Sequence, residues 1–395
     1  MSDYFCIMPW VSMHVTSEGF ARPCCVSDYR YNFGSIKNSS LKEVWNSEEI
    51  RKFRLDLLNG KKVDACENCY YNEMLGNSSL RQDMNRKYEK HFSYLKDTDD
   101  TGKFDKFNLA LWDFRFSNLC NFKCVMCSAE TSSSWGVELK QLLKKTKYDP
   151  IKKIEIWEEL EPLYDVVEEI YFAGGEPLIM EEHYKIINRL VELKKFDVVL
   201  KYNTNFSNIT YKGINIIEIW NKFNNVQLTI SLDGYSERGE LIRKGLDWKK
   251  FVDNIDVLRR TYNKEYTIDC VVQALNANHL FDMHINLLNN KIIRSVDDFN
   301  IFFLTDPEYL SIDILPISMK NELCSRIENH INQFLIPNNS KRSIQQFKSM
   351  INLLNTCEDK TYLLPQFRKY INALDNFRNQ NTSTIFPELK DILLS

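Results

Sequence analysis

The chain lacks a strong excess of charge, an export signal and any apolar run long enough to cross a membrane. Lysine and arginine number 51 and aspartate and glutamate 54, so the formal net charge is −3. Without a basic stripe interleaved with aromatic residues, we expect no nucleic-acid partner, because nucleic acids are bound through clustered positive charge. The first residues lack the basic and apolar regions of a signal peptide, and a transmembrane helix needs about 20 apolar residues. We therefore expect a cytoplasmic protein with no membrane partner.

Cysteine, by contrast, is abundant. The chain has 395 residues, of which 44% are hydrophobic, so it can bury at least one sizeable core. Eight of its eleven cysteines lie in the first 127 residues. Disulfides are rare in the cytosol, and the grouping of these cysteines indicates metal binding instead. The remaining three, Cys270, Cys324 and Cys357, have apolar surroundings typical of core residues.

Short β-rich runs alternate with helical segments from Leu109 onward. Because each run is followed by a helical pattern, we expect parallel strands joined by right-handed crossovers. This order predicts an α/β fold, a partial (β/α)6 barrel, with a Rossmann-like open sheet as the alternative. The predicted strands are residues 109–116, 169–173, 198–202, 226–232, 266–273 and 299–304.

Composition divides the chain into four parts. Residues 1–80 form a small cysteine-bearing domain, and residues 81–106, rich in lysine and aspartate, form a polar linker or exposed helix. Residues 107–315 form the barrel. Residues 316–395 form a helical C-terminal region with helical patterns at 320–334, 344–354 and 364–377, and we expect it to cap the open side of the barrel.

Three cysteines follow the first predicted strand. Cys120, Cys124 and Cys127 share one loop at the C-terminal end of that strand, where active sites collect in parallel α/β folds. Three thiolates can bind three irons of a 4Fe-4S cluster and leave the fourth iron open to another ligand. A zinc site is the alternative that this spacing leaves open.

The CxxxCxxC spacing resembles the signature of the radical S-adenosylmethionine (SAM) superfamily. The resemblance implies that SAM chelates the open iron and that an electron, from a reductant such as flavodoxin or ferredoxin, cleaves it to methionine and a 5′-deoxyadenosyl radical. That radical would abstract hydrogen from the substrate. Met126 stands where the family more often has an aromatic residue, and we expect its thioether to pack on the adenine ring.

Motifs at the ends of later strands extend the resemblance. Gly174, Gly175 and Glu176, followed by proline, are similar to the family's GGEP motif, in which glycine lets the backbone approach the methionyl ammonium. A plain turn before a helix is the alternative. Arg243 lies in a run similar to the family's IRxG and is the candidate partner of the SAM carboxylate. The other cofactor contacts that the resemblance implies are Thr204, Asn205, Ser231, Asp233, Gln273 and Asn276.

The cysteines before the barrel resemble the auxiliary-cluster pattern of SPASM and twitch domains. Cys6 is followed by twelve residues, Gly19, four residues and Cys24, and the segment between reads as a β-hairpin. Cys66 and Cys69 follow a helical stretch over residues 41–58. With these two cysteines, the resemblance implies a second 4Fe-4S cluster with four thiolates, Cys25 being the alternative to Cys24. No further cysteine pair follows before Cys120, which favours the smaller twitch type. A four-cysteine zinc knuckle is the alternative.

These features predict a radical SAM enzyme with one auxiliary 4Fe-4S cluster, placed unusually before the barrel. The leading substrate is a peptide or protein side chain, because most relatives with this cysteine pattern modify peptides. The alternative is a small metabolite such as an amino sugar or nucleoside, and a zinc-binding interaction protein is a more remote one. The six histidines, His14 among them, are scattered and are expected to be structural. The sequence names no catalytic acid or base.

Overall fold

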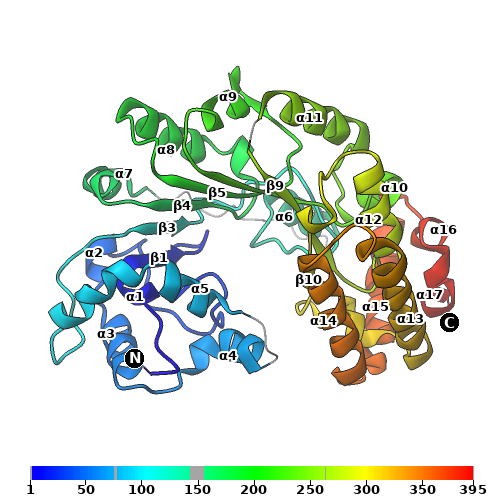
Figure 1. The fold of residues 1–395 in the computed structure, drawn as a ribbon, viewed down its shortest axis with the longest axis horizontal. Coiled ribbons are helices and arrows are strands. Elements are labelled where there is room, and N and C mark those ends of the chain that lie inside the picture. Colours follow the sequence, from blue (N-terminus) through cyan, green and yellow to red (C-terminus); the bar gives the residue numbers. More distant parts are fainter. Residues whose placement is uncertain (1, 75–77, 143–154, 263, 395) are drawn as a thin grey trace. The chain divides into compact units, whose positions relative to one another are not determined.

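The computed structural model describes residues 2–74, 78–142, 155–262 and 264–394. They form two compact units, one of residues 1–119, 149–202 and 222–227 and the other of residues 120–148, 203–221 and 228–395 (Figure 1). Residues 75–77 of the predicted cysteine-bearing domain and 143–154 of the predicted barrel lie outside the described residues. No helix in the described part of the chain is long and apolar enough to span a membrane.

The first unit is built on a sheet with the strand order β2-β1-β3-β4-β5. The predicted N-terminal hairpin is present as an antiparallel pair, and Gly19 in its turn has φ +83°, a conformation that glycine adopts without strain. The hairpin also extends the main sheet, because β1 pairs in parallel with β3. The strands are β1 (Ser12–Val15), β2 (Ala21–Arg22), β3 (Leu111–Phe114), β4 (Glu169–Phe172) and β5 (Val199–Thr204).

Short helices surround the N-terminal hairpin. The helical pattern expected over residues 41–58 is two helices, because Ser47 caps the second by accepting a hydrogen bond from the backbone N–H of Ile50. The segment 81–106 contains α5 and η2, and Phe104 near its end is fully buried. The helices of this unit are α1 (Met8–Val11), α2 (Leu41–Val44), α3 (Glu48–Leu58), α4 (Glu67–Met74), α5 (Leu80–Lys87), α7 (Trp157–Leu160) and α8 (Glu181–Glu192), with 3-10 turns η1 (Asp64–Cys66), η2 (Glu89–Asp97), η3 (Glu161–Asp165) and η4 (Pro177–Ile179).

The second unit contains β8 (Val226–Ser231) from Leu228 onward, β9 (Tyr266–Val272) and β10 (Phe299–Phe303), paired in parallel in that order. All six predicted strands are therefore present, and the predicted α/β class is confirmed. In the first unit the backbone N–H of Leu200 in β5 donates to the carbonyl of Asn225 (3.1 Å), so β8 begins beside β5. A Rossmann-like sheet would instead reverse its order here and place the fourth strand beside the first.

The three predicted C-terminal helices are present as α13, α14 and α15, and α14 packs against both α13 and β10 (Figure 1). His284 stacks on Phe347, and the ring of His330 lies tilted against the same phenylalanine. Burial lowers the pKa of His284 to about 4 and that of His330 to about 3. The remaining elements of the unit are α6 (Ser133–Leu142), α9 (Ile216–Trp220), α10 (Ser236–Ile242), α11 (Trp248–Thr261), α12 (Leu280–Asn289), α13 (Ile317–His330), α14 (Arg342–Thr356), α15 (Leu364–Arg378), α16 (Thr382–Ile385), α17 (Lys390–Leu394) and a small hairpin of β6 (Thr210–Tyr211) and β7 (Ile214–Asn215).

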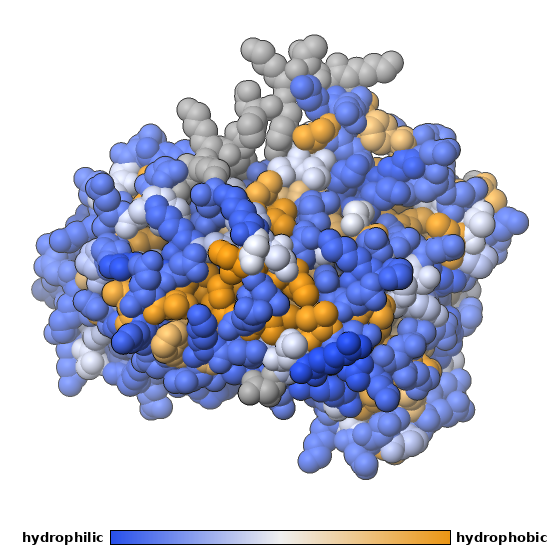
Figure 2. Space-filling view, turned by 90° about the horizontal axis from the view of Figure 1, so that it is seen from above, coloured by the Kyte–Doolittle hydropathy of each residue, from blue (hydrophilic) through white to orange (hydrophobic). Residues whose placement is uncertain are grey.

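The molecular surface is mainly hydrophilic on the face shown in Figure 2, where apolar side chains form a band between charged ones. Exposed apolar side chains are common on folded proteins, so we assign no role to this band.

Candidate iron-sulfur and cofactor sites

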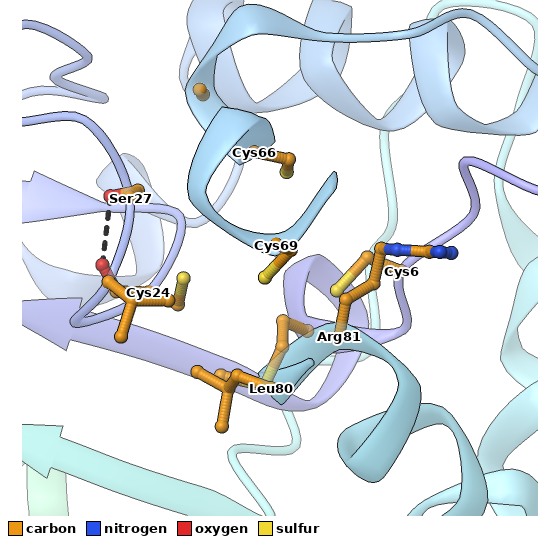
Figure 3. Close-up of a pocket in the computed structure, with 10 residues that line it drawn as sticks. Cys6, Cys24, Ser27, Cys66, Cys69, Leu80 and Arg81 are labelled. Carbon is orange, nitrogen blue, oxygen red and sulfur yellow. Dashed lines mark hydrogen bonds between the residues drawn. The ribbon is translucent and has the colours of Figure 1, made fainter. Parts of the chain in front are cut away.

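Four thiols line one pocket of the first unit (Figure 3). Cys6 precedes α1, Cys24 follows β2, Cys66 ends η1 and Cys69 lies in the first half of α4. Among the described residues, no three metal-ligating side chains converge tightly enough to be grouped around a single ion. The four thiols nevertheless line the same pocket, and four thiolates are the ligand set of a 4Fe-4S cluster without an open iron.

Cys25 lies in different surroundings from Cys24. It is exposed and is absent from the pocket lining, and its thiol is hydrogen-bonded to the carboxylate of Asp113 in β3. Cys24 contributes to the pocket, as Figure 3 shows. The geometry therefore favours Cys24 as the fourth ligand, which was one of the two alternatives left open by the sequence.

The pocket thiols are protonated when no metal is bound. Burial raises the pKa of Cys66 to about 12, with a smaller contribution from the neighbouring Cys69. Burial also raises the pKa of Cys6 and Cys24. Thiolates, not thiols, are the metal ligands, so occupation of this pocket by a cluster must release protons.

Cys120, Cys124 and Cys127 lie on the loop between β3 and α6, in the second unit. Two backbone hydrogen bonds join this loop to the end of α10 and the residues after it, from Lys123 N–H to the Lys244 carbonyl (2.7 Å) and from Val125 N–H to the Ile242 carbonyl (2.8 Å). The segment that resembles the IRxG motif thus packs directly on the cysteine loop.

Arg243 carries positive charge to this loop. Its Nε lies 2.7 Å from Oδ2 of Asp233, and both side chains are buried. Burial opposes the charge of Arg243, but Asp233 and then the Cys124 thiol outweigh it and raise the pKa of Arg243, so it stays a cation. This charge lies close enough to the loop to favour thiolate over thiol there.

The end of β5 is tied to the same loop. The side-chain amide of Asn205 donates to Oδ1 of Asn121 (3.0 Å), which lies between Cys120 and Cys124, and Asn121 in turn donates to Oγ of Ser207 (2.8 Å). Thr204 accepts a hydrogen bond from the Phe206 N–H (2.9 Å). The end of β5, with Thr204 and Asn205, therefore lies at the cysteine loop, and the contacts of these two residues with SAM remain predictions.

The predicted contacts on β9 are deeply buried. Asn276 donates to the carbonyls of Asp233 (3.1 Å) and Val271 (3.0 Å), so its amide joins the ends of β8 and β9. Both polar side-chain atoms of Gln273 are buried with no hydrogen-bond partner among the described residues. An unpaired buried amide is costly, and a polar ligand group would satisfy it. Ser231 and Met126 are half-buried, and their cofactor contacts remain predictions.

The turn after β4 lies against the start of the cysteine loop, within the first unit. Gly174 and Gly175 have φ of +83° and +57°, and a Cβ on Gly175 would come within 2.3 Å of the Leu119 carbonyl oxygen. The Glu176 N–H donates to the same carbonyl (2.8 Å). Glycine is therefore required where the turn meets the residue preceding Cys120.

The C-terminal helix α15 holds the cysteine loop from a position that the sequence did not reveal. The hydroxyl of Tyr370 donates to the Val125 carbonyl (2.6 Å), and Arg378 donates to the Lys123 carbonyl (2.8 Å). Trp135 in α6 donates to the Cys124 carbonyl between them (2.8 Å). These partners are separated by up to 255 residues along the chain, and no local pattern marks them.

A row of polar side chains crosses one face of the first unit's sheet. Cross-strand pairing places Arg22 opposite His14, His14 opposite Asp113, and Tyr171 opposite Lys201. Arg115 and His14 each contact Asp113 at 2.8 Å. Burial opposes ionisation of Asp113, but these two groups hold its pKa below the ordinary value. In the sequence, the alternation of Asp113 and Arg115 with Trp112 and Phe114 was the signal that could have indicated a polar face on this strand.

Comparison with known families identifies both cysteine regions. Residues 114–276 match the radical SAM superfamily model, and residues 6–70 match SPASM, an iron-sulfur cluster-binding domain. The chain therefore contains a radical SAM domain, and its iron-sulfur cluster-binding domain lies N-terminal to that domain. SAM and iron-sulfur clusters are the cofactors of these domains, which favours clusters over both zinc alternatives.

Individual relatives match only part of the chain. It is 27% identical over 187 residues to the S-adenosylmethionine-dependent nucleotide dehydratase RSAD2 of Siniperca chuatsi. The matched region is 45% of this chain and 47% of that protein. SuiB of Streptococcus suis bound to S-adenosylmethionine matches with a TM-score of 0.38 and 17% identity over 74% of this chain and 62% of SuiB. anSMEcpe with bound AdoMet and Cp18Cys peptide matches with a TM-score of 0.39 and 18% identity over 56% and 60% of the chains. The chain thus spans about half of the curated relative and three fifths of the solved proteins.

Proposed function

We propose that the protein is a radical SAM enzyme that abstracts hydrogen from a peptide or protein side chain with the aid of one auxiliary 4Fe-4S cluster. The observation that carries this proposal is the presence of two separate thiol sets. Three thiols share the loop beside Arg243, and four line the pocket of Figure 3. Three thiols leave one iron of a cluster open, whereas four leave none.

We assign the following roles to residues of the chain in the proposed reaction. Cys120, Cys124 and Cys127 would hold the first cluster, which with SAM at its open iron would supply the radical that removes hydrogen from the substrate. Hydrogen bonds from Trp135, Tyr370 and Arg378 to backbone carbonyls fix the conformation of the cysteine loop. A one-electron carrier such as flavodoxin or ferredoxin supplies the electron. The cytoplasm, where thiols stay reduced, is the compartment we propose.

The substrate would bind over the polar row of the first unit. Arg115 and Lys201 both lie at Tyr171, at 4.6 and 5.2 Å from its ring centroid. Arginine and lysine bind carboxylates and phosphates, and Cys25 and His14 stand beside them. Support for a peptide comes from the auxiliary-cluster cysteine pattern, which resembles that of peptide-modifying relatives.

A nucleotide is the second candidate substrate. Two observations favour it: the nucleotide dehydratase named above is 27% identical to this chain over 187 residues, and the polar row carries the cations Arg22, Arg115 and Lys201. Phosphate groups would pair with these cations.

The test is release of 5′-deoxyadenosine by the anaerobically reconstituted protein with dithionite and SAM. We expect slow uncoupled release alone and a rise of at least tenfold with the true substrate, supplied as a peptide library in one arm and ribonucleoside triphosphates in the other. If the triphosphates stimulate 5′-deoxyadenosine release and the peptides do not, the substrate is a nucleotide and not a peptide. Absence of any 5′-deoxyadenosine from protein with full iron content would contradict the proposed enzyme.

A further inference from the structure

Arg81, which lines the four-thiol pocket, forms a largely buried ion pair with Glu73. Glu73 lies in α4, one turn after Cys69, and Arg81 lies in α5. Arg81 Nη2 and Nε contact the two carboxylate oxygens of Glu73 at 2.5 and 3.1 Å, and the two side chains are only 7% and 18% exposed. Figure 3 shows Arg81 beside Cys6. Solvent and salt screen such a pair weakly.

Arg81 is connected to two of the four thiols. Its Nη1 donates to the carbonyl of Phe5 (2.8 Å), the residue before Cys6. Its backbone N–H is hydrogen-bonded to the sulfur of Cys69, and the Ser79 hydroxyl donates to Oε1 of Glu73. Ser79 is also the N-cap of α5, so the positive end of that helix faces Cys69.

We propose that the Glu73–Arg81 pair sets the reduction potential of the auxiliary cluster. The inference rests on the proposed four-thiol cluster and goes beyond it. Reduction adds negative charge to a cluster, so a nearby cation favours the reduced state and a nearby anion opposes it, and cluster potentials depend on local charge and on hydrogen bonds to the sulfurs. Glu73 offsets the charge of Arg81, and the pair holds the potential between the values that either residue alone would impose.

Two single variants separate the two charges. We use the full chain with Cys120, Cys124 and Cys127 changed to Ala, so that only the four-thiol pocket can hold a cluster. The reconstituted protein is titrated with a reductant and followed by electron paramagnetic resonance. Arg81→Gln should shift the midpoint potential downward, because Glu73 is left uncompensated, and Glu73→Gln should shift it upward. The double variant should return near the starting value.

A matched pair on the same helix provides the control. Arg86 and Asp83 form an ion pair in α5 but are 66% and 49% exposed. Arg86→Gln removes the same charge from the same helix and should leave the potential unchanged, because solvent screens it.

The outcomes are distinguishable. Shifts of the same sign in both single variants, or no shift in Glu73→Gln, would overturn the inference. If Arg81→Gln fails to retain iron, Glu73→Gln decides, since it keeps the bonds from Arg81 to Phe5 and Cys69. If the starting protein binds no iron, the proposed auxiliary cluster itself is refuted, whereas four bound irons with an unmoved potential refute only the tuning by this pair.

Discussion

At the scale of single residues, adjacent cysteines have separate environments. Cys24 lines the pocket with three other thiols, whereas Cys25 is hydrogen-bonded to Asp113 on the sheet. Cys24→Ala should therefore lower the iron content by about four atoms per chain, the content of one cluster, and Cys25→Ala should leave it unchanged. Iron and sulfide analysis of the two reconstituted variants checks this. Equal losses in both would mean that the ligands exchange.

Gly175 is the second informative residue. A Cβ there would lie 2.3 Å from the Leu119 carbonyl oxygen and 2.6 Å from Met180 Cε, in a left-handed conformation that valine avoids. Gly175→Val should weaken SAM binding at least tenfold, by displacing the turn, and calorimetry on the reconstituted protein measures this. The four-thiol cluster provides the internal control, because its iron should remain. Unchanged SAM affinity would show that this turn has a structural role only.

At the scale of elements, helix α15 belongs to the cofactor site. Tyr370→Phe removes the donor to the Val125 carbonyl, which leaves a buried acceptor unpaired at a cost of about 1–3 kcal/mol. We expect the three-thiol cluster to lose iron faster on exposure to a chelator, with the four-thiol cluster unaffected. Tyr362→Phe, at a tyrosine 67% exposed, is the control. Identical loss rates for the two variants would remove α15 from the site.

The strands were predictable and this helix contact was not. Strand β5 alternates half-buried and buried side chains from Val199 to Thr204, and that two-residue period is visible in sequence. The helical stretch expected over residues 41–58 is helical but is divided into two helices at Ser47, which caps the second one. The three-cysteine loop was visible from spacing, but its donors Tyr370 and Arg378 are set by tertiary packing. The polar row likewise depends on strand register, which no single strand specifies.

At the scale of the whole molecule, buried histidines predict acid sensitivity. Desolvation by burial lowers the pKa of His183, His279, His284 and His330 to about 3, 3, 4 and 3, against about 6.5 in an unfolded chain. The unfolded state therefore binds more protons between about pH 6.5 and these lower values, and the free energy of unfolding falls as the pH falls through that window.

Each of these histidines lowers the free energy of unfolding by up to about 1.4 kcal/mol per pH unit within that window. Urea unfolding of the metal-free protein at pH 7.0, 6.0 and 5.0 measures the loss, and the metal-free form avoids acid loss of the clusters. His284→Phe together with His330→Leu should flatten the profile. A free energy of unfolding that stays constant from pH 7 to pH 5 would contradict the neutral, buried state of these histidines.

The most direct test of two separate clusters is iron content and 5′-deoxyadenosine release measured together in three proteins. The first variant is the triple variant Cys120→Ala, Cys124→Ala and Cys127→Ala, and the second is the double variant Cys66→Ala and Cys69→Ala. We expect about eight irons in the unaltered chain and about four in each variant. The first variant should release no 5′-deoxyadenosine, whereas the second should still release some, uncoupled from product. Release by the triple variant, or full iron content in the double variant, would contradict the account.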